Sequence, residues 1–219
     1  MDLYFTRHGK TEWNNERRFQ GMMGDSPLLP HSYEEIRLLG QHLQKASFEK
    51  IYTSSALRAQ KTAMGIAEQL DQEVEIVVSD GLKELGLGDL EGQFIDEMYE
   101  RYPEELKNLR HHLDKYDPSI FHGEPIQDAL ARIEKVVTEA VAAAEKGPLL
   151  FIGHGASLTA AIQWLLGKDL ADLREMGGLV NNSLTLLEAE EPQRKLPYRL
   201  KIWNDTGFLG ADAEVDALL

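Results

Sequence analysis

Two short apolar runs in this chain each lead into a histidine, and these positions constrain the fold more than any other feature. The run LYF at residues 3–5 leads into His8, and the run LLFIG at Leu149–Gly153 leads into His154. A buried strand consists of apolar residues, so a polar residue just past its end usually faces a crevice rather than the core. We therefore expect two imidazoles at one edge of a sheet.

Apolar periodicity predicts an alternation of strands and helices. The expected strands are Leu3–Thr6, Lys50–Thr53, Glu75–Ser79, Leu149–Gly153, Leu184–Glu188 and Arg199–Trp203. The expected helices are Ser32–Ala46, Ala56–Leu70, Ile95–Leu113 with an interruption at Pro103, Pro125–Glu145 and Ser157–Leu166. This order predicts one α/β domain over residues 1–219, with an open, mostly parallel sheet and helices on both faces.

Composition narrows the function classes. The formal net charge is -14, which argues against nucleic acid or an anionic membrane surface as the main partner. There is no cysteine, no apolar stretch of membrane-spanning length and no signal-peptide pattern, so a cytoplasmic protein is expected. Residues 210–219 are small, acidic and weakly patterned, which is typical of a loose tail.

Charged and polar residues follow four of the expected strands. Arg7 and His8 follow the first strand, Arg58 lies in the first turn after the second, Glu84 follows the third, and His154 follows the fourth. In open α/β sheets, ligands bind beyond the carboxyl ends of the strands. We therefore expect these five side chains to converge on one site.

This set of side chains fits phosphoryl transfer. Guanidinium groups stay charged and match phosphate oxygens with a planar fork of donors. A neutral imidazole can attack phosphorus and form a covalent phosphohistidine. A carboxylic acid can protonate the leaving oxygen and later activate water. With Arg7, Arg58 and His154 supplying positive charge, this chemistry needs no metal ion.

Seven motifs occur in an order that resembles the histidine phosphatase superfamily, in its phosphoglycerate mutase-like branch. They are Arg7–Asn14 (RHGKTEWN), Phe19–Gly21, Asp25–Leu28, Tyr52–Ala59, Glu84–Gly92, Gly153–Gly155 and Asn181–Ser183. The resemblance implies that His8 is the nucleophile, that Arg7, Arg58 and His154 form the phosphate pocket, and that Glu84 is the proton donor. It also implies that Asn14, Gln20, Gly21 and the backbone N–H of Gly155 line the phosphate or substrate, with no metal and no cofactor.

Some positions depart from the family pattern. Lys10 stands where glutamate or glutamine is common and could add positive charge near the pocket mouth. Leu29 and Pro30 replace a threonine-led helix start, which moves the expected N-cap to Ser32. Ala56 replaces a common proline, and Pro125 replaces a common serine. These changes affect substrate choice rather than reaction class.

The stretch between Glu84 and His154 resembles the shorter form found in phosphatases, and an apolar segment at about residues 93–123 is expected to form a small helical cap. We therefore expect hydrolysis of a small phosphomonoester. A cofactor-dependent phosphoglycerate mutase, a metal-dependent hydrolase and a non-catalytic phosphate-binding module remain alternatives. A homo-oligomer is one option for the assembly.

Each site residue also has a structural interpretation. Arg58 could be a solvated helix residue, Asn14 could cap a turn, and Gln20 could lie on the surface. Glu84 has two nearby competitors for the role of acid, Asp89 and Glu91. His122 could reach the substrate from the cap.

Overall fold

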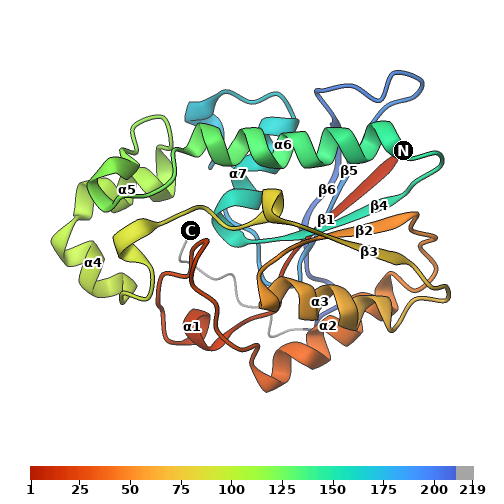
Figure 1. The fold of residues 1–219 in the computed structure, drawn as a ribbon, viewed down its shortest axis with the longest axis horizontal. Coiled ribbons are helices and arrows are strands. Elements are labelled where there is room, and N and C mark those ends of the chain that lie inside the picture. Colours follow the sequence, from red (N-terminus) through yellow and green to blue (C-terminus); the bar gives the residue numbers. More distant parts are fainter. Residues whose placement is uncertain (211–219) are drawn as a thin grey trace.

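A mixed six-stranded sheet forms the centre of the computed structural model, which describes residues 1–210 (Figure 1). Its strands are β1 (Asp2–Arg7), β2 (Lys50–Ser54), β3 (Glu75–Ser79), β4 (Leu149–Gly153), β5 (Leu184–Glu188) and β6 (Arg199–Asp205). The spatial order is β3-β2-β4-β1-β5-β6. Strands β1 to β4 pair in parallel, and β5 is antiparallel to both of its neighbours. The expected open, mostly parallel sheet is confirmed.

The helices largely follow the apolar periodicity. They are α1 (Glu12–Asn15), α2 (Pro30–His42), α3 (Leu57–Ala67), α4 (Ile95–Arg101), α5 (Pro103–His111), α6 (Ile126–Ala143) and α7 (Gly155–Leu165). The expected N-cap at Ser32 is wrong, because α2 begins at Pro30 with Leu29 as its cap. Proline suits the first turn, where its missing N–H is not needed. The Ser32 hydroxyl instead donates to the carbonyl oxygen of Lys10, 2.7 Å away.

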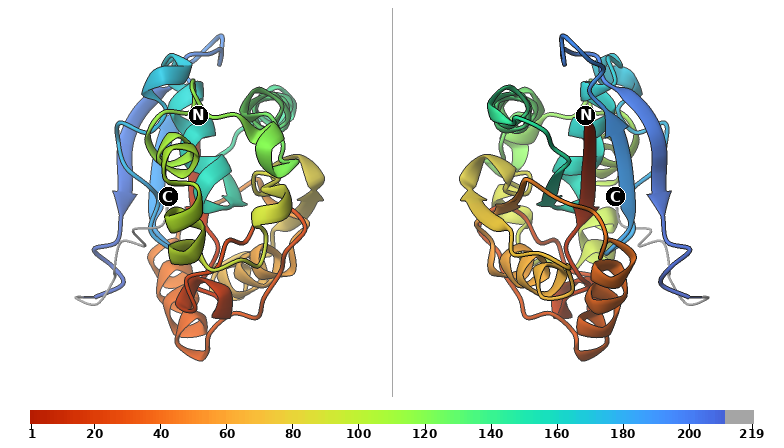
Figure 2. Two further views of the ribbon diagram at one scale, coloured as in Figure 1. Left: turned by 90° about the vertical axis from the view of Figure 1, so that its left-hand side faces the viewer. Right: turned by 90° about the vertical axis from the view of Figure 1, so that its right-hand side faces the viewer.

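The two faces of the sheet support separate cores. Along β4, Leu149 and Phe151 belong to the core on the α6 and α7 side, whereas Leu150 and Ile152 belong to the core on the α2 and α3 side. This division follows from the alternation of side chains along a strand. Helices α6 and α7 lie on one side of the sheet and α2 and α3 on the other (Figures 1 and 2). Every side chain of β4 is therefore buried, as a central parallel strand requires.

The segment expected to form the cap folds as α4, α5 and the 3₁₀ helix η3 (Pro118–Phe121). Pro103 begins α5, so the predicted interruption is confirmed. Met98, Leu106 and Phe121 are buried against the core on the α6 and α7 side. These helices lie at the end of the molecule toward which β1 and β4 run (Figure 1).

Two sequence expectations concern the termini and the membrane. Apart from Gly210, the tail expected at residues 210–219 lies outside the described residues. Over residues 1–210, no helix combines the length and apolar character that a membrane span requires.

Candidate active site

The end of β1 presents His8 with one ring nitrogen available as an acceptor. Its Nδ1 lies 2.7 Å from the carbonyl oxygen of Gly9, which can only accept, so Nδ1 carries the proton. Nε2 therefore has a lone pair and accepts a hydrogen bond from Arg58 Nε at 3.2 Å. Burial, followed by the charges of Arg58 and Arg7, holds the pKa of His8 well below its ordinary value. The imidazole is thus neutral at pH 7, as a nucleophile must be.

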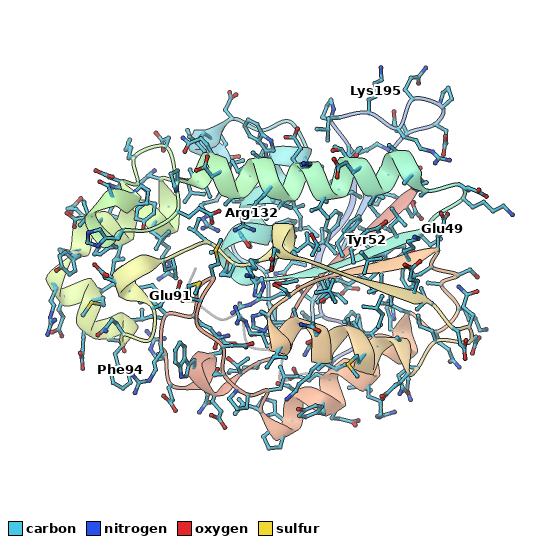
Figure 3. All side chains as sticks on the ribbon, in the orientation of Figure 1. Glu49, Tyr52, Glu91, Phe94, Arg132 and Lys195 are labelled. Atoms are coloured by element: carbon cyan, nitrogen blue, oxygen red, sulfur yellow. The ribbon has the colours of Figure 1, made fainter. Side chains whose placement is uncertain are left out.

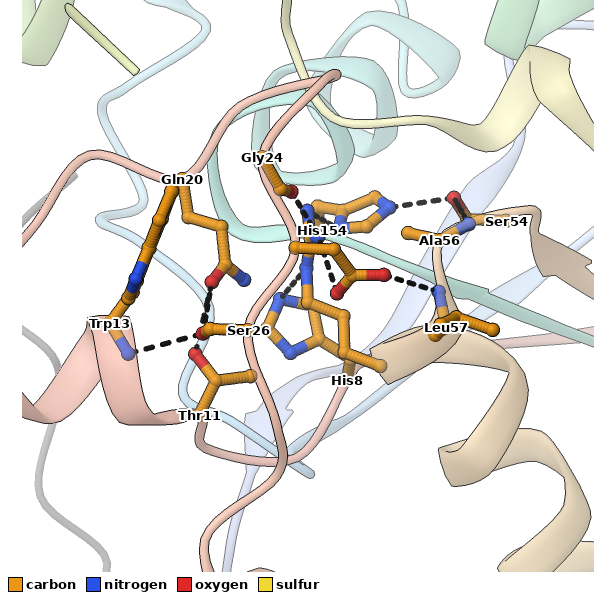
Figure 4. A network of polar contacts seen from close by, with 12 residues as sticks. His8, Thr11, Trp13, Gln20, Gly24, Ser26, Ser54, Ala56, Leu57 and His154 are labelled. Atoms are coloured by element: carbon orange, nitrogen blue, oxygen red, sulfur yellow. Dashed lines mark hydrogen bonds and ion pairs between the residues drawn. The ribbon is translucent and has the colours of Figure 1, made fainter. Parts of the chain in front are cut away.

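His154, at the end of β4, has the opposite tautomer. Arg58 Nη2 donates to its Nδ1 at 3.0 Å, so Nε2 carries the proton and donates to Ser54 Oγ at 2.7 Å (Figure 4). Burial and then the charge of Arg58 hold the pKa of His154 well below its ordinary value. In this arrangement, without a bound phosphoryl group, the imidazole of His154 is neutral and the positive charge lies on the arginines.

Arg58 joins the two histidines. Besides its contacts to both rings, its Nη2 donates to Gly21 O at 3.2 Å, and its Nη1 donates to Gly24 O at 2.7 Å and to Asp25 at 3.1 Å. The side chain is 1% exposed. Burial lowers the pKa of Arg58, and the charge of Asp25 opposes that effect. The interpretation of Arg58 as a solvated helix residue is wrong, because every guanidinium nitrogen points into this network.

Arg7 lies against the first residue of α7. Its Nη1 donates to the carbonyl oxygen of Leu179 at 2.9 Å, and the side chain is buried. A Cβ at Gly155 would lie 3.1 Å from Arg7 Cζ and 3.2 Å from Nε, tighter than ordinary packing. Glycine at position 155 therefore lets the guanidinium pack directly on the N-terminus of α7.

Glu84 is buried at the same helix N-terminus. Its carboxylate accepts hydrogen bonds from the backbone N–H groups of Ala156 at 2.9 Å, Ser157 at 2.7 Å and Leu85 at 2.8 Å. The side chain is 4% exposed. A helix N-terminus favours negative charge, so α7 fixes the carboxylate beside the histidine that precedes the helix.

The two competing acids have other contacts. One oxygen of Glu91 accepts from the backbone N–H groups of Met23 at 2.9 Å and Gly24 at 2.5 Å (Figure 3). It thereby holds the loop whose carbonyl oxygens accept from Arg58. Asp89 accepts a hydrogen bond from the exposed His122 at 2.7 Å. Glu84 is therefore the carboxylate that lies at the N-terminus of α7.

The amide of Gln20 has a defined orientation. Ser26 Oγ accepts from the Trp13 N–H at 3.1 Å, so its own proton goes to Gln20 Oε1 at 2.5 Å (Figure 4). Gln20 Nε2 is buried and has no hydrogen-bond partner among residues 1–210. The Gln20 side chain is 9% exposed, so the surface interpretation is wrong. Its free amide N–H groups are available to a bound group.

Asn14 has a capping role. Its Oδ1 accepts from the Thr11 N–H at 3.1 Å, and its own N–H donates to Thr11 Oγ1 at 3.3 Å, which forms a capping box at the start of α1. The Thr11 hydroxyl also lies 3.3 Å from Gln20 Oε1. The turn-capping interpretation of Asn14 is therefore confirmed. Gly21 contributes its backbone carbonyl to Arg58, as described above.

Three supporting residues were not assigned roles from the sequence. Asn181 Nδ2 donates to His8 O at 2.7 Å, and Thr62 accepts from the Gly9 N–H at 3.0 Å while donating to Arg58 O at 2.8 Å. Arg132 of α6 donates to Lys83 O at 2.6 Å and to Glu84 O at 2.9 Å (Figure 3). The Asn181–Ser183 motif in the sequence indicated a role for Asn181. Nothing local in the sequence indicated Thr62 or Arg132.

Within residues 1–210 the structure contains no group of three or more histidine or acidic side chains placed to hold a metal ion. The chemistry available to the site comes from a neutral imidazole, two buried guanidinium groups, a buried carboxyl group and free amide donors.

Comparisons with known proteins agree with this geometry. The model of the histidine phosphatase superfamily (branch 1) matches residues 3–206. "Probable phosphoglycerate mutase GpmB" from Serratia proteamaculans is 32% identical over 168 residues, covering 76% of this chain and 75% of that protein. "Phosphoserine phosphatase 1" from Hydrogenobacter thermophilus is 27% identical over 202 residues, covering 92% of each. The solved mycobacterial glucosyl-3-phosphoglycerate phosphatase in complex with VO3 has a TM-score of 0.83 at 27% identity, covering 94% of this chain and 99% of that one.

Proposed function

This chain belongs to the histidine phosphatase superfamily (branch 1), and we propose that it hydrolyses a small phosphomonoester through a phosphohistidine on His8. The observation that carries the proposal is the state of His8: a neutral ring whose Nε2 lone pair faces the guanidinium of Arg58. A phosphoryl group held by that guanidinium lies next to the attacking nitrogen.

The first half-reaction transfers the phosphoryl group. His8 Nε2 attacks phosphorus, the bond from phosphorus to the ester oxygen breaks, and the leaving oxygen takes a proton from Glu84. Glu84 enters this step protonated and leaves it as the carboxylate that the N-terminus of α7 binds. Arg7 and Arg58 neutralise the charge that spreads over the equatorial oxygens. The proposal assigns this compensation to the two guanidinium groups rather than to a metal ion.

The second half-reaction uses the same groups in reverse. The Glu84 carboxylate takes a proton from water as that water attacks phosphorus, the bond to Nε2 breaks, and inorganic phosphate leaves with His8 neutral again. The Nδ1–H bond to Gly9 O stabilises the ring in both halves, because it orients the imidazole and favours the tautomer with a free Nε2.

A phosphoglycerate mutase is the second candidate, because one relative carries that name. The two activities share the loading of His8 and differ in whether water or a second hydroxyl takes the phosphoryl group. The phosphatase is favoured by the similarity to proteins named phosphoserine phosphatase and glucosyl-3-phosphoglycerate phosphatase, both over most of the chain.

The deciding experiment measures phosphate release from a panel of phosphomonoesters, with and without 2,3-bisphosphoglycerate, in the presence of a chelator. Hydrolysis that is unaffected by chelator and competitively inhibited by vanadate supports the phosphatase. Interconversion of phosphoglycerates that requires the bisphosphate, with little phosphate release, would favour the mutase. Loss of all activity on chelation would contradict the metal-independent mechanism.

A further inference from the structure

A buried arginine that the proposed mechanism does not use lies beside the site. Arg174 is 8% exposed, and its Nη1 donates to the carbonyl oxygen of Ala156 at 3.1 Å. Its Nε and Nη2 are buried and have no hydrogen-bond partner among residues 1–210. Burial lowers the pKa of Arg174 to about 10, so the guanidinium is still charged at neutral pH.

The unpaired edge of Arg174 distinguishes it from Arg58, which is also buried, and from the half-buried Arg132. Arg58 and Arg132 donate from all three of their guanidinium nitrogens. A buried polar group without a partner is rare and destabilising, and the penalty is larger when the group is charged. Two unpaired donors on one cation therefore point to a group that binds there.

The shape of the free edge indicates the chemistry of that group. Nε and Nη2 are the two nitrogens whose N–H bonds point in the same direction along one edge of the planar guanidinium. This edge matches the two oxygens of one carboxylate in a bidentate pair. A carboxylate also carries the single negative charge that one guanidinium neutralises, whereas a phosphate dianion would leave a buried charge unbalanced.

Arg174 lies close to the proposed acid, Glu84. Ala156 joins it to the proposed acid, because its carbonyl accepts from Arg174 while its N–H donates to Glu84 at 2.9 Å. The guanidinium and the Glu84 carboxylate are thus no more than about 10 Å apart. Glu84 and then Tyr99 of α4 act electrostatically on Arg174, so both groups lie in the neighbourhood of the guanidinium.

We propose that Arg174 binds a carboxylate of the substrate's leaving group, an inference that rests on the proposed function. The substrate is then a phosphomonoester whose ester oxygen and carboxylate are separated by one to three carbons. The phosphate occupies Arg7, Arg58 and His8, the ester oxygen faces Glu84, and the carboxylate fills the free edge of Arg174. The phosphate-site side chains and Arg174 are all at least nine-tenths buried, so a bound substrate would be enclosed at both ends.

Two matched substrate pairs test this assignment. 3-Phosphoglycerate is compared with glycerol 3-phosphate, and O-phosphoserine with phosphoethanolamine, because each pair differs by the carboxylate. We expect the wild type to favour the carboxylate member in kcat/KM. Arg174→Met should lower kcat/KM for that member about 30- to 100-fold and change the other less than about threefold. The exposed Arg101→Met at the end of α4 is the matched control and should change neither.

The outcomes separate this inference from the proposed function. If Arg174→Met lowers kcat/KM equally for both members of each pair, Arg174 has only a structural role. If the variant lowers kcat/KM for neither member, Arg174 does not contact the substrate. If Arg174→Met does not fold, the inference is tested by the wild type's preference for the carboxylate substrates and by Arg174→Lys. Lysine keeps the positive charge but lacks the two parallel N–H donors, so this variant should retain only part of that preference. A wild type that hydrolyses aryl phosphate without any carboxylate preference overturns the inference and leaves the phosphatase intact. A wild type that hydrolyses no phosphomonoester overturns the phosphatase itself.

Discussion

At the end of β1, His8 donates from Nδ1 to its neighbour's carbonyl and keeps Nε2 as an acceptor, whereas at the end of β4, His154 donates from Nε2 to Ser54 and accepts at Nδ1. Both strands are parallel neighbours, both histidines precede a glycine, and both rings contact Arg58. The rings are 5.2 Å apart between centroids. The difference between these two strand ends therefore comes from the hydrogen-bond partner of each ring.

Because of this difference, the ends of β1 and β4 are suited to different roles in the proposed reaction. Among residues 1–210, His8 Nε2 has a single hydrogen bond, at the long end of the usual range, so an incoming phosphoryl group can replace it. Both nitrogens of His154 are engaged at 3.0 Å or less, and the helix that follows it binds Glu84. The β1 end thus suits attack on phosphorus, and the β4 end suits positioning and proton transfer.

The sharpest test removes one histidine at a time. We expect His8→Ala to lower kcat on the order of 10⁴-fold or more, because the covalent route is lost. His154→Ala should cost about 10²-fold, because only positioning and a hydrogen bond are lost. Acid-stable versus acid-labile phosphate on rapidly quenched enzyme measures the phosphohistidine directly. A phosphoenzyme trapped on His8→Ala would reverse the assignment, and unchanged circular dichroism is the control for folding.

The next largest effect should come from the acid held at the β4 end. Glu84→Gln keeps the size of the side chain and one of its two acceptor oxygens, but cannot supply a proton. We expect kcat/KM to fall about 10²- to 10³-fold for alkyl phosphates, whose leaving oxygen needs that proton, and less than about tenfold for p-nitrophenyl phosphate. The exposed Glu97→Gln on α4 is a suitable control. A uniform loss over both leaving groups would point to a different acid.

Neutrality of both rings makes stability depend on pH. Folding lowers the pKa of His8 and His154, so below about pH 6.5 the unfolded chain takes up protons that the folded chain does not. The free energy of unfolding should therefore fall with decreasing pH, by up to about 1.4 kcal/mol per pH unit for each histidine. Urea unfolding at pH 7.5 and 5.5 measures this slope. His154→Gln should reduce it, and an unchanged slope would mean that His154 is protonated in the fold.

The smallest effect should come from the partner that sets the tautomer of His154. Ser54→Ala removes the acceptor of the Nε2–H bond, and the lost hydrogen bond is worth about 1 kcal/mol. We expect kcat to fall about five- to tenfold with vanadate affinity nearly unchanged. The exposed Ser119→Ala serves as the control. A loss as large as that of His154→Ala would mean that the hydroxyl itself takes part in the reaction.

Much of this site could be predicted because strand ends are local features. The apolar runs before His8 and His154 define buried strands, and the parallel arrangement brings their carboxyl ends together. Arg58 is placed for the same reason, in the first turn after β2. The helix break at Pro103 is likewise a property of one residue.

Other contacts could not be predicted because they join distant segments. Arg132 reaches the carbonyl of Glu84 across 48 positions, and Arg174 reaches Ala156 across 18. The start of α2 was misplaced because serine is a good N-cap, while the actual structure uses the Ser32 hydroxyl to bind Lys10 O. Intrinsic propensity indicates which local conformations a residue favours, and tertiary packing determines which of them is adopted.

The sequence alone determined which groups the site contains and at which edge of the sheet they meet, because apolar periodicity specifies strands and strand direction specifies the edge. The protonation state of each histidine, the helix terminus that binds Glu84 and the free edge of Arg174 were decided only by the tertiary structure. Tautomers and buried charges depend on partners within about 3 Å, and those partners come from segments that become neighbours only when the chain is folded.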